Sequence, residues 1–324
     1  MSPVSGRPEA VVVGAGVIGL STAACLAERR VRVEVRAELE PAQTTSAVAS
    51  AMIGPAIAPA DSRISRWEQA SIAYFGGLAD QEGSGVMMCR GRLTARQPVP
   101  APPGDVEPCG AEELPSGFAV GYWATLPLVD MVRYLSYLAA RLTTAGGRIA
   151  LRRVPSLPEL ADEVGLIVNC AGLGARELAA DDSVIPARGQ HVVVENPGVQ
   201  EFFMEAPFAE EWAAYWPYPG HVVLGGSSRP GDASTEPDLE LAERIVARCV
   251  EVEPRLRDAR VLAHQVGLRP GRPTPRLDTE RIGAARCVHS YGHGGSGVTY
   301  SWGAAVDAAE MLLERGGGVD ERAG

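Results

Sequence analysis

Three groups of residues have types and spacings that could do chemistry. Gly14-Ala15-Gly16-Val17-Ile18-Gly19 has the G-x-G-x-x-G pattern, which lets a phosphate approach backbone N–H groups at a helix N-terminus. The segment from Tyr291 to Thr299 places four glycines within six residues. Arg269 ends an apolar run and precedes a proline, and a planar guanidinium pairs well with a carboxylate. These groups predict separate contacts for a phosphate, for a second closely approached group and for an acid.

The first glycine turn must lie between a strand and a helix to bind a phosphate. Residues 10–13 form a short apolar run, residues 20–29 continue with helix-forming residues, and residues 31–35 form a β-branched run. We expect Gly14 to make the tight turn, Gly16 to admit the phosphate and Gly19 to let the helix pack on the strand. The segment therefore predicts a βαβ unit that binds a dinucleotide.

A ribose-binding carboxylate is expected where the second strand of such a unit ends. Ala37 stands at about this position, and Glu38 follows it. Glu38 is our candidate for the ribose contact. The alternative, that Glu38 belongs to a solvated strand end, stays equally open.

The second glycine-rich loop lies between a predicted strand and a predicted helix. The phosphate already has a site at Gly14, so a second loop of bare backbone indicates another group that must be approached closely. An isoalloxazine ring fits, because a helix N-terminus near its N1 end would stabilise the reduced flavin. A plain glycine turn is the alternative. An NAD-linked dehydrogenase is weaker, since it leaves this loop without a purpose.

The remaining pattern predicts the elements that position these groups. Helices are expected at residues 64–78, from Pro127 to an end at Gly146-Gly147, and at residues 302–315 before Gly316, with proline-rich surface turns at 96–104 and 270–275. Apolar runs at 149–153, 166–168 and 286–290 indicate a parallel sheet, whereas 191–195, 221–224 and 260–268 have patterns typical of antiparallel strands. We therefore predict an α/β protein with a Rossmann-like FAD-binding domain and an interleaved substrate domain with a mixed or antiparallel sheet. The expected boundaries are 1–54, 135–185 and 270–324 for the FAD-binding domain, and 55–134 and 186–269 for the substrate-binding domain.

Composition excludes several classes of protein. The 324 residues include 30 basic and 40 acidic side chains, for a net charge of -10, so we expect no nucleic-acid partner. The chain has no lysine, which excludes a Schiff-base lysine and a P-loop. Its six cysteines show no metal-binding spacing, and we expect no metal site. With no signal peptide and no membrane span in the sequence, we expect free thiols and a cytoplasmic location.

The order of these motifs resembles the D-amino-acid oxidase family of FAD flavoproteins, which includes D-aspartate oxidases. The resemblance spans nearly the whole chain. It is carried by Gly14 to Gly19, Thr44 to Ala49, Asn169 to Gly172, Arg188-Gly189-Gln190, Val223 to Gly226, Gly267 to Pro270 and Tyr291 to Thr299.

The resemblance implies FAD as cofactor and oxidation of a small, neutral D-amino acid. Hydride transfer from the α-carbon to flavin N5 would give an imino acid, which hydrolyses to a 2-oxo acid and ammonia, and O₂ would reoxidise the flavin to yield H₂O₂. By the same resemblance, Arg269 holds the substrate carboxylate, Tyr215 donates its hydroxyl to that group, and the carbonyl of Gly295 accepts from the amine. No side-chain base is needed, because orientation carries the reaction. Gly54 stands beside the substrate, where some members have a polar residue, which implies a roomier pocket.

The resemblance also implies the contacts of the cofactor and a possible homodimer. The five histidines, His293 included, are expected to be structural, and Arg272 to be a surface or structural charge. The residues implied to contact FAD are Gly14, Ala15, Gly16, Val17, Ile18, Gly19, Ala37, Glu38, Thr44, Thr45, Ser46, Ala51, Met52, Val154, Ala171, Gly172, Gly294, Gly295, Ser296, Gly297, Val298 and Thr299.

Three alternatives stay open. The first is an oxidase of glycine or sarcosine. The second is a D-aspartate oxidase, which requires another cation near the side chain; Arg229 is a candidate, although an arginine in an exposed turn explains it equally simply. The third is a flavin-binding redox module without catalysis, which Arg269 and Tyr215 disfavour because a sensor needs no carboxylate-binding groups.

Overall fold

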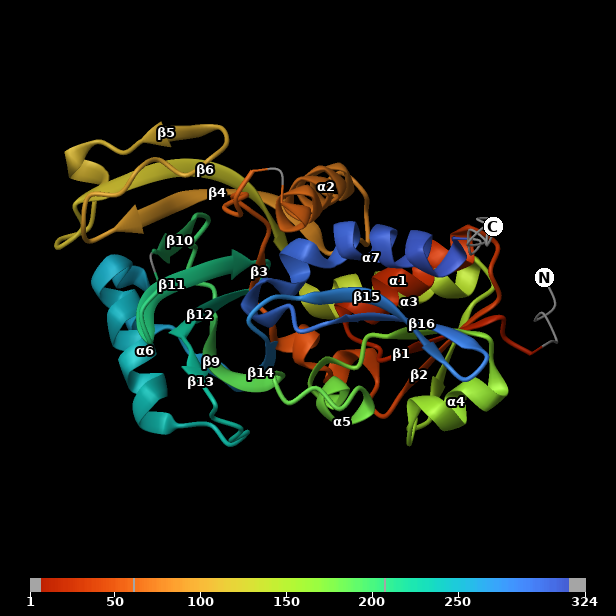
Figure 1. Ribbon diagram of the computed structural model, residues 1–324. Coiled ribbons are helices and arrows are strands. Elements are labelled where there is room, and N and C mark those ends of the chain that lie inside the picture. Colours follow the sequence, from red (N-terminus) through yellow and green to blue (C-terminus); the bar gives the residue numbers. More distant parts are fainter. Residues whose placement is uncertain (1–6, 61, 207, 315–324) are drawn as a thin grey trace.

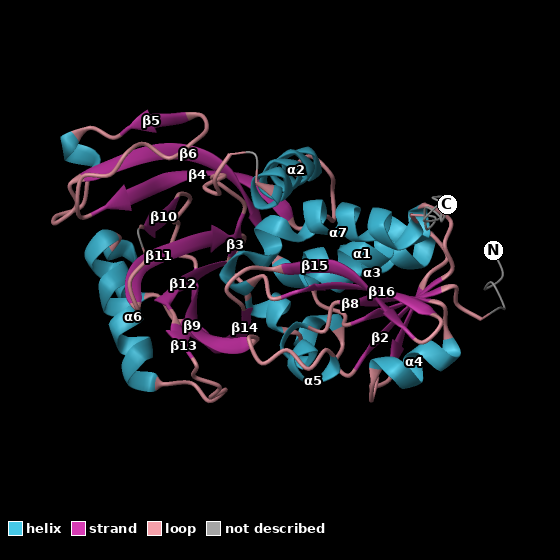
Figure 2. Cartoon of the chain, viewed as in Figure 1, coloured by secondary structure: helices cyan, strands magenta, loops and turns pink. Residues whose placement is uncertain are grey.

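The fold contains two β-sheets that lie side by side, with helices on both (Figure 1). A computed structural model describes residues 7–60, 62–206 and 208–314. Figure 2 shows helices gathered mainly around one sheet and α6 against the other. The α-helices are α1 (Val17–Glu28), α2 (Arg63–Leu78), α3 (Met131–Thr144), α4 (Leu157–Glu163), α5 (Ala175–Leu178), α6 (Leu239–Val252) and α7 (Gly297–Leu313).

The first sheet has six strands in the order β15-β16-β8-β1-β2-β7. All neighbours are parallel except the β15–β16 hairpin. Its central strands are short and fully buried, as expected for a parallel sheet covered on both faces. The strands are β1 (Ala10–Val13), β2 (Val33–Ala37), β7 (Arg148–Leu151), β8 (Leu166–Asn169), β15 (Arg276–Ile282) and β16 (Ala285–Tyr291).

Helices cover both faces of this first sheet. Alternate residues of β1 separate its two cores: Val12 packs in the cluster that includes α1, α3 and α7, and Val11 packs with Leu157 and Leu160 of α4. The N-termini of α3 and α4 are fixed by side chains, since Asp130 accepts from the backbone of Arg133 and Ser156 from that of Glu159. The carboxyl ends of β1, β2 and β8 are thereby held toward the second sheet (Figure 1).

The second sheet is mixed, with the order β13-β9-β12-β11-β10-β4-β6-β3 and with β14 and β5 joined to β9 and β6. Only the β10–β4 pair in it is parallel. Amphipathic α6 covers one face, where it packs with β9, β11 and β12. The strands are β3 (Ala51–Met52), β4 (Val86–Ala95), β5 (Val106–Pro108), β6 (Val120–Val129), β9 (Ile185–Glu195), β10 (Phe202–Glu205), β11 (Glu211–Tyr218), β12 (His221–Ser227), β13 (Arg229–Pro230) and β14 (Val261–Gly271).

Three predicted elements were wrong at their ends. The helix expected from Pro127 begins at Met131, because Pro127 pairs with Met88 inside β6 and Asp130 provides the N-cap. Pro270 and Gly271 belong to β14, where they pair with Pro186 and Ile185, so the expected turn starts later. The last helix begins at Gly297, five residues before the predicted start, and its predicted end at Arg315 and Gly316 lies outside the described residues.

The predicted fold class, an α/β protein with one parallel and one mixed sheet, is confirmed. The domain boundaries stay a prediction. Strand β3 already belongs to the second sheet although residues 51–52 fall in the predicted FAD-binding domain, and α3 begins four residues before the predicted boundary at 135.

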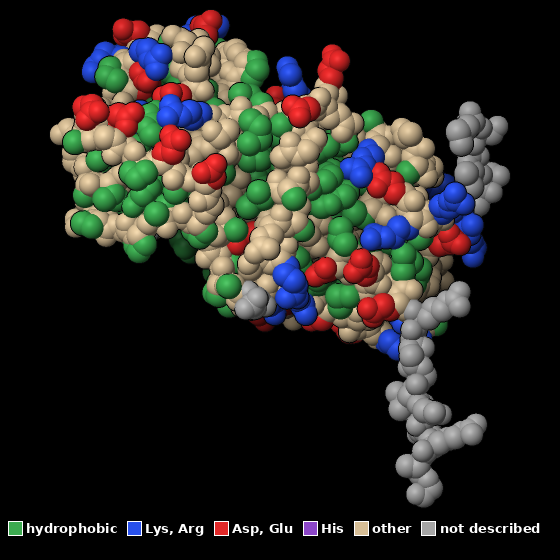
Figure 3. Space-filling model, turned by 90° about the horizontal axis from the view of Figure 1, so that it is seen from above, with side chains coloured by type: hydrophobic (Ala, Val, Ile, Leu, Met, Phe, Trp, Pro, Cys, Tyr) green, Lys and Arg blue, Asp and Glu red, His purple; other side chains and the backbone are tan. Residues whose placement is uncertain are grey.

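The surface and the cysteines agree with the composition. Basic and acidic side chains are interspersed on the face seen in Figure 3. Among the described helices, none is long and apolar enough to cross a membrane, and no group of His, Cys, Asp and Glu in the described part of the chain could hold a metal ion. All six cysteines are free thiols.

Candidate functional site

A cavity of about 400 Å³ lies where the two sheets meet. It opens at the carboxyl ends of the parallel strands, where Val13, Ala37 and Cys170 line it, and Gly189 and Gly267 of the second sheet also line it. Ligands of open α/β sheets bind at this edge. Of the predicted site residues, those that line the cavity are Gly14, Ala15, Gly16, Val17, Ile18, Ala37, Glu38, Thr44, Thr45, Ser46, Val154, Ala171, Gly172, Gly294, Gly295, Gly297, Val298 and Arg269.

The glycine turn at the N-terminus of α1 forms one part of this wall. Gly14 has φ +104°, and a Cβ there would lie 2.5 Å from the carbonyl oxygen of Cys170. Helix α1 has Gly16 as its N-cap, no side-chain cap and no acidic residue in its first turn. The amide of Val17 donates to Ser46 Oγ at 3.0 Å. This end therefore offers backbone donors and a positive helix terminus, as an anion requires.

Gly19 acts in a different way from the other glycines of this turn. It does not line the cavity, and a Cβ there would lie 2.0 Å from the carbonyl oxygen of Gly14. Because Gly19 has no side chain, α1 packs directly against the turn.

Charged residues mark the end of the cavity beyond β2. Glu38 lines the cavity and pairs with Arg153 at 2.9 Å, and Arg153 also lies 3.6 Å from Glu177. Arg36 is buried and pairs with Glu34 at 2.6 Å and Glu163 at 2.8 Å. Glu38 thus stands at the predicted position, with its carboxylate already engaged by a neighbouring arginine. A ribose contact from it stays a prediction.

The second glycine loop forms the opposite wall, where it leads into α7. Gly294, Gly295, Gly297 and Val298 line the cavity, whereas Ser296 and Thr299 do not. His293 also lines it and packs against Trp67, with ring centroids 6.0 Å apart. Burial lowers the pKa of His293 to about 4, so the ring is neutral at physiological pH. Its Nε2 has no partner among the described residues.

Arg269 faces the cavity beside this loop. Its Nη1 donates to the carbonyl of Ser227 at 3.2 Å, and its guanidinium lies so close to Gly189 that a Cβ there would be 2.2 Å from Nη1. Gly295 lies on its other side, where a Cβ built on the glycine would be 3.5 Å from Arg269 Cδ. No carboxylate of the described residues pairs with it, and burial lowers its pKa. The cavity therefore contains a cation without a partner anion among the residues that the structure describes.

His191 lies next to Arg269 and was not predicted as a site residue. It lines the cavity, its Nδ1 lies 3.2 Å from the carbonyl oxygen of Val48, and its Nε2 lies 3.3 Å from Ser50 Oγ. Burial and the charge of Arg269 lower its pKa to about 4. The neutral ring donates from Nδ1, because a carbonyl can only accept, so Nε2 accepts from Ser50. Its position after Arg188-Gly189-Gln190 on a strand was the only signal in the sequence.

Tyr215 is a correction to the sequence analysis. Its ring is buried on the α6 side of β11, stacked on Phe203 with centroids 5.8 Å apart, and it does not line the cavity. The next residue, Trp216, has the opposite orientation because strand residues alternate. Trp216 lies 6.0 Å from His191, centroid to centroid. Tyr215 is therefore a core residue.

Three more predicted positions lie away from the cavity. Ala51 packs in the core of the first sheet, Met52 packs against the core of the second, and a Cβ at Gly54 would meet Ile72 and Leu126. Gly54 is thus surrounded by apolar side chains. Arg272 is structural, as expected, because it pairs with Asp181 at 2.9 Å.

Comparison with known proteins decides the family. The profile described as FAD dependent oxidoreductase matches residues 9–311, nearly the whole chain. The chain belongs to the FAD-dependent oxidoreductase family. The resemblance seen in the sequence is thereby confirmed, and FAD is the cofactor of the family.

Relatives within this family are similar along their full length. The D-amino-acid oxidase of Rubrobacter xylanophilus is 46% identical over 309 residues, 93% of this chain and 95% of that protein. The D-amino-acid oxidase of Streptomyces coelicolor is 43% identical over 317 residues, 94% and 96% of the two chains. Among solved structures, glycine oxidase from Geobacillus kaustophilus has a TM-score of 0.82 at 19% identity, with 95% of both chains covered, and so shares the fold.

The cavity fits the cofactor of this family at both ends. An uncapped helix N-terminus and the bare backbone at Gly14 and Gly16 suit its pyrophosphate, and the loop at Gly294 and Gly295 leaves room for a flat ring. Val154, Ala171 and Gly172 also line this cavity.

Proposed function

We propose that this protein is an FAD-dependent oxidase of neutral D-amino acids. The overall reaction converts a D-amino acid, O₂ and water into a 2-oxo acid, ammonia and H₂O₂. The observation that supports this most directly is Arg269, a guanidinium without a partner anion that borders Gly295 inside the cofactor cavity. The names of the two relatives above agree with the proposal.

Arg269 and Gly295 orient the substrate in this proposal. The Arg269 N–H groups that Ser227 does not occupy bind the substrate carboxylate through charge-assisted hydrogen bonds. The Gly295 carbonyl accepts a hydrogen bond from the amine, which selects one face of the α-carbon. Bound FAD supplies the acceptor for the α-hydrogen and its electron pair. Orientation by two contacts on the α-carbon substituents then accounts for the catalytic role of the protein.

General base catalysis by histidine is not part of the mechanism. His191 donates to Val48 and accepts from Ser50, and burial lowers the pKa of both His191 and His293 to about 4, which makes both rings weak bases. Their function in the site is to exclude water and to hold the walls of the cavity. A substrate amine that loses its proton to solvent before it binds is sufficient for the reaction.

A neutral side chain is favoured by the charges around the cavity. Besides Arg269, the charged lining residues are Arg36, Glu38, Arg153 and Glu177, which form ion pairs with carboxylates or arginines beyond β2. Arg229 was the candidate to bind the side-chain carboxylate of D-aspartate, but it pairs with Asp238 at 3.2 Å. No free cation of the described lining residues is therefore left for the side chain of D-aspartate.

An anaerobic flavin-reduction screen tests the proposed function. Purified holoenzyme is mixed with D-alanine, D-methionine, D-aspartate, glycine and the matching L-amino acids, and the flavin absorption is followed. We expect bleaching by D-alanine and D-methionine and none by the L-enantiomers. Faster reduction by glycine or D-aspartate would assign another substrate, and retention of FAD with no reduction by any amino acid would indicate a redox module.

The proposal extends to the acceptor, the assembly and the location. Release of H₂O₂ during turnover in air tests O₂ as acceptor. The six free cysteines agree with a reducing cytoplasm. A homodimer is proposed because two-fold dimers are the commonest assemblies among soluble oligomers, and light scattering of the purified holoenzyme tests it.

A further inference from the structure

Strands β9 and β12 of the second sheet separate next to Arg269. Strands β12 and β9 pair from His221–Glu195 to Leu224–Val192, and pairing resumes only where β13 places Arg229 opposite Arg188. The residues between, from Gly225 to Ser228, leave the ladder with β9, although Gly225 and Ser227 stay paired with β11. The backbone of β9 at Gln190 would therefore have a buried N–H without a strand partner, which is costly.

The hydroxyl of Ser227 takes the place of the missing strand partner. The amide of Gln190 donates to Ser227 Oγ at 3.0 Å, and Ser227 Oγ lies 3.4 Å from the Gln190 carbonyl, to which it donates. Ser227 is buried, with 2% of its surface exposed. These two contacts fix Ser227 on β9, and its own carbonyl then accepts from Arg269 Nη1 at 3.2 Å.

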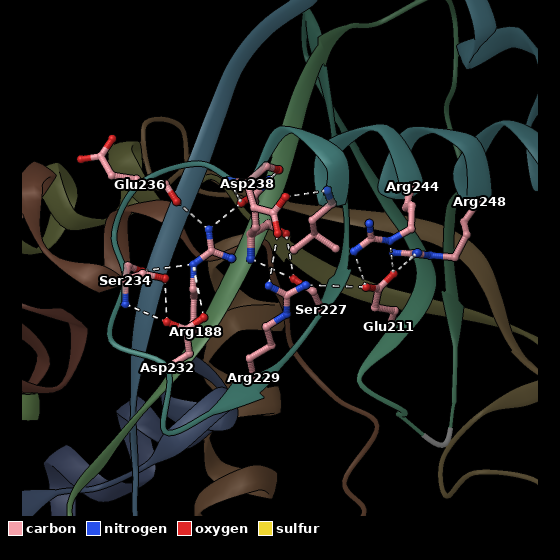
Figure 4. Close-up of polar contacts among 12 residues, drawn as sticks. Arg188, Glu211, Ser227, Arg229, Asp232, Ser234, Glu236, Asp238, Arg244 and Arg248 are labelled. Atoms are coloured by element: carbon pink, nitrogen blue, oxygen red, sulfur yellow. Dashed lines mark hydrogen bonds and ion pairs between the residues drawn. The ribbon is translucent and has the colours of Figure 1, made fainter.

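Ser227 is itself held in a network that continues on the face of β9 away from the cavity. Gln190 Oε1 accepts from Arg188 at 2.7 Å and from the amide of Asp238 at 2.9 Å, and Gln190 Nε2 donates to the carbonyl of Asp238 at 2.7 Å. Arg188 also donates to the carbonyl oxygens of Ser234 and Glu236 (Figure 4). Both polar atoms of the Gln190 side chain are therefore hydrogen-bonded. These bonds hold Gln190 in place, so its backbone binds Ser227 from a fixed position.

We infer that Ser227 is the residue that positions Arg269 for the substrate carboxylate. The hydroxyl anchors the chain to Gln190, and the carbonyl takes one donor of the guanidinium, so that the remaining donors face the cavity. Gly189 permits this arrangement because the guanidinium lies over its bare Cα. The inference rests on the proposed role of Arg269, and it adds the residue that sets the direction of its donors.

Removal of the hydroxyl tests this role with a readout other than stability. In Ser227→Ala, Gln190 N–H loses its acceptor and the 227 carbonyl is free to move, so carboxylate binding weakens. We expect the KM of D-alanine and the dissociation constant of propionate, measured by the change in flavin absorption, to rise together about tenfold. FAD retention stays at the wild-type level, and kcat stays within about threefold, since the reacting atoms are unchanged.

Ser84 provides a matched control away from the cavity. It is also buried, accepts from the amide of Val86 at 3.1 Å and donates to the carbonyl of Leu78 at 2.9 Å. Ser84→Ala should lower the melting temperature and leave the propionate dissociation constant unchanged. Wild-type propionate binding in Ser227→Ala, or an equal rise in Ser84→Ala, would overturn the inference.

An isosteric pair keeps the test valid if Ser227→Ala does not fold. Ser227→Thr retains a hydroxyl, and Ser227→Val has the same shape without one, so only the valine variant should bind propionate weakly. Equal binding by the two variants would overturn the inference. A wild-type holoenzyme that binds propionate but oxidises no D-amino acid refutes the proposed function instead. In that case the rise in melting temperature on addition of propionate, compared between the wild type and the Ser227 variants, still decides the role of Ser227.

Discussion

Arg269 is the residue on which the proposed substrate affinity depends most. Arg269→Leu removes the charge and the N–H donors that would bind the carboxylate, so we expect the KM of D-alanine to rise about 100-fold or more, a loss of about 3 kcal/mol. Steady-state kinetics on FAD-saturated enzyme measures it. Arg260→Leu is the control, because Arg260 is exposed and pairs with Glu195 at the surface. An unchanged KM in Arg269→Leu would remove the carboxylate role.

Tyr215 is predicted to be dispensable for substrate binding, in contrast to what the resemblance implied. Its hydroxyl is buried on the α6 side, near Arg92. Tyr215→Phe should therefore leave the KM of D-alanine within about twofold and lower the free energy of unfolding by about 1 kcal/mol. Kinetics and urea unfolding of the same preparation measure both quantities. A large rise in KM with unchanged stability would return Tyr215 to the site.

The error at Tyr215 shows what a single sequence leaves undetermined. Strand residues alternate between the two faces, so a shift of one residue exchanges Tyr215 for Trp216. The β11–β12 pair contains such a shift between Glu211 and Ala214, and no residue type in the segment marks it. By contrast, Gly14 and Arg269 were predictable, because a phosphate turn and a carboxylate contact each require a particular residue type.

At the scale of elements, the close contact between the phosphate turn and α1 is the critical feature. Gly19→Ala would place a Cβ 2.0 Å from the Gly14 carbonyl and push the helix from the turn. We expect a rise in the FAD dissociation constant of about tenfold or more, as overpacking of 1–3 kcal/mol implies. Gly165→Ala is the control, because no atom lies within 4 Å of its added Cβ. Equal FAD binding by both variants would contradict this account.

Element types were more predictable than element ends and contacts between distant elements. The βαβ unit and α2 follow from periodicity, but Pro127 was assigned to a helix start because proline is favoured there. Its pairing with Met88 across β6 and β4 is a tertiary contact that local preference does not contain. The same is true of His191, whose partners Val48 and Ser50 lie more than 140 residues away in the chain.

At the scale of the whole molecule, His191 makes the contact between β9 and the segment before β3 sensitive to pH. It connects β9 of the second sheet to the segment before β3, and its pKa is about 4 when folded and 6.5 when unfolded. The unfolded chain therefore binds more protons between these values, so stability is full above pH 6.5 and falls as the pH drops toward 4. His293, with the same shift, adds to this effect.

Thermal unfolding across this pH range measures the effect. The melting temperature of the wild type should fall steadily from pH 6.5 to pH 4, and His191→Gln, which cannot take up the proton, should show a shallower fall. His264 is exposed on β14, and His264→Gln provides the control variant. Identical pH profiles for all three proteins would show that another group controls acid stability.

The partnerless guanidinium of Arg269 has a consequence for every assay of this enzyme. A positive site that the polypeptide leaves uncompensated attracts whatever small anion the solution supplies, and halides or acetate from a buffer are candidates to fill it. Measured substrate affinity then depends on the choice of salt, with inorganic ions acting as competitors.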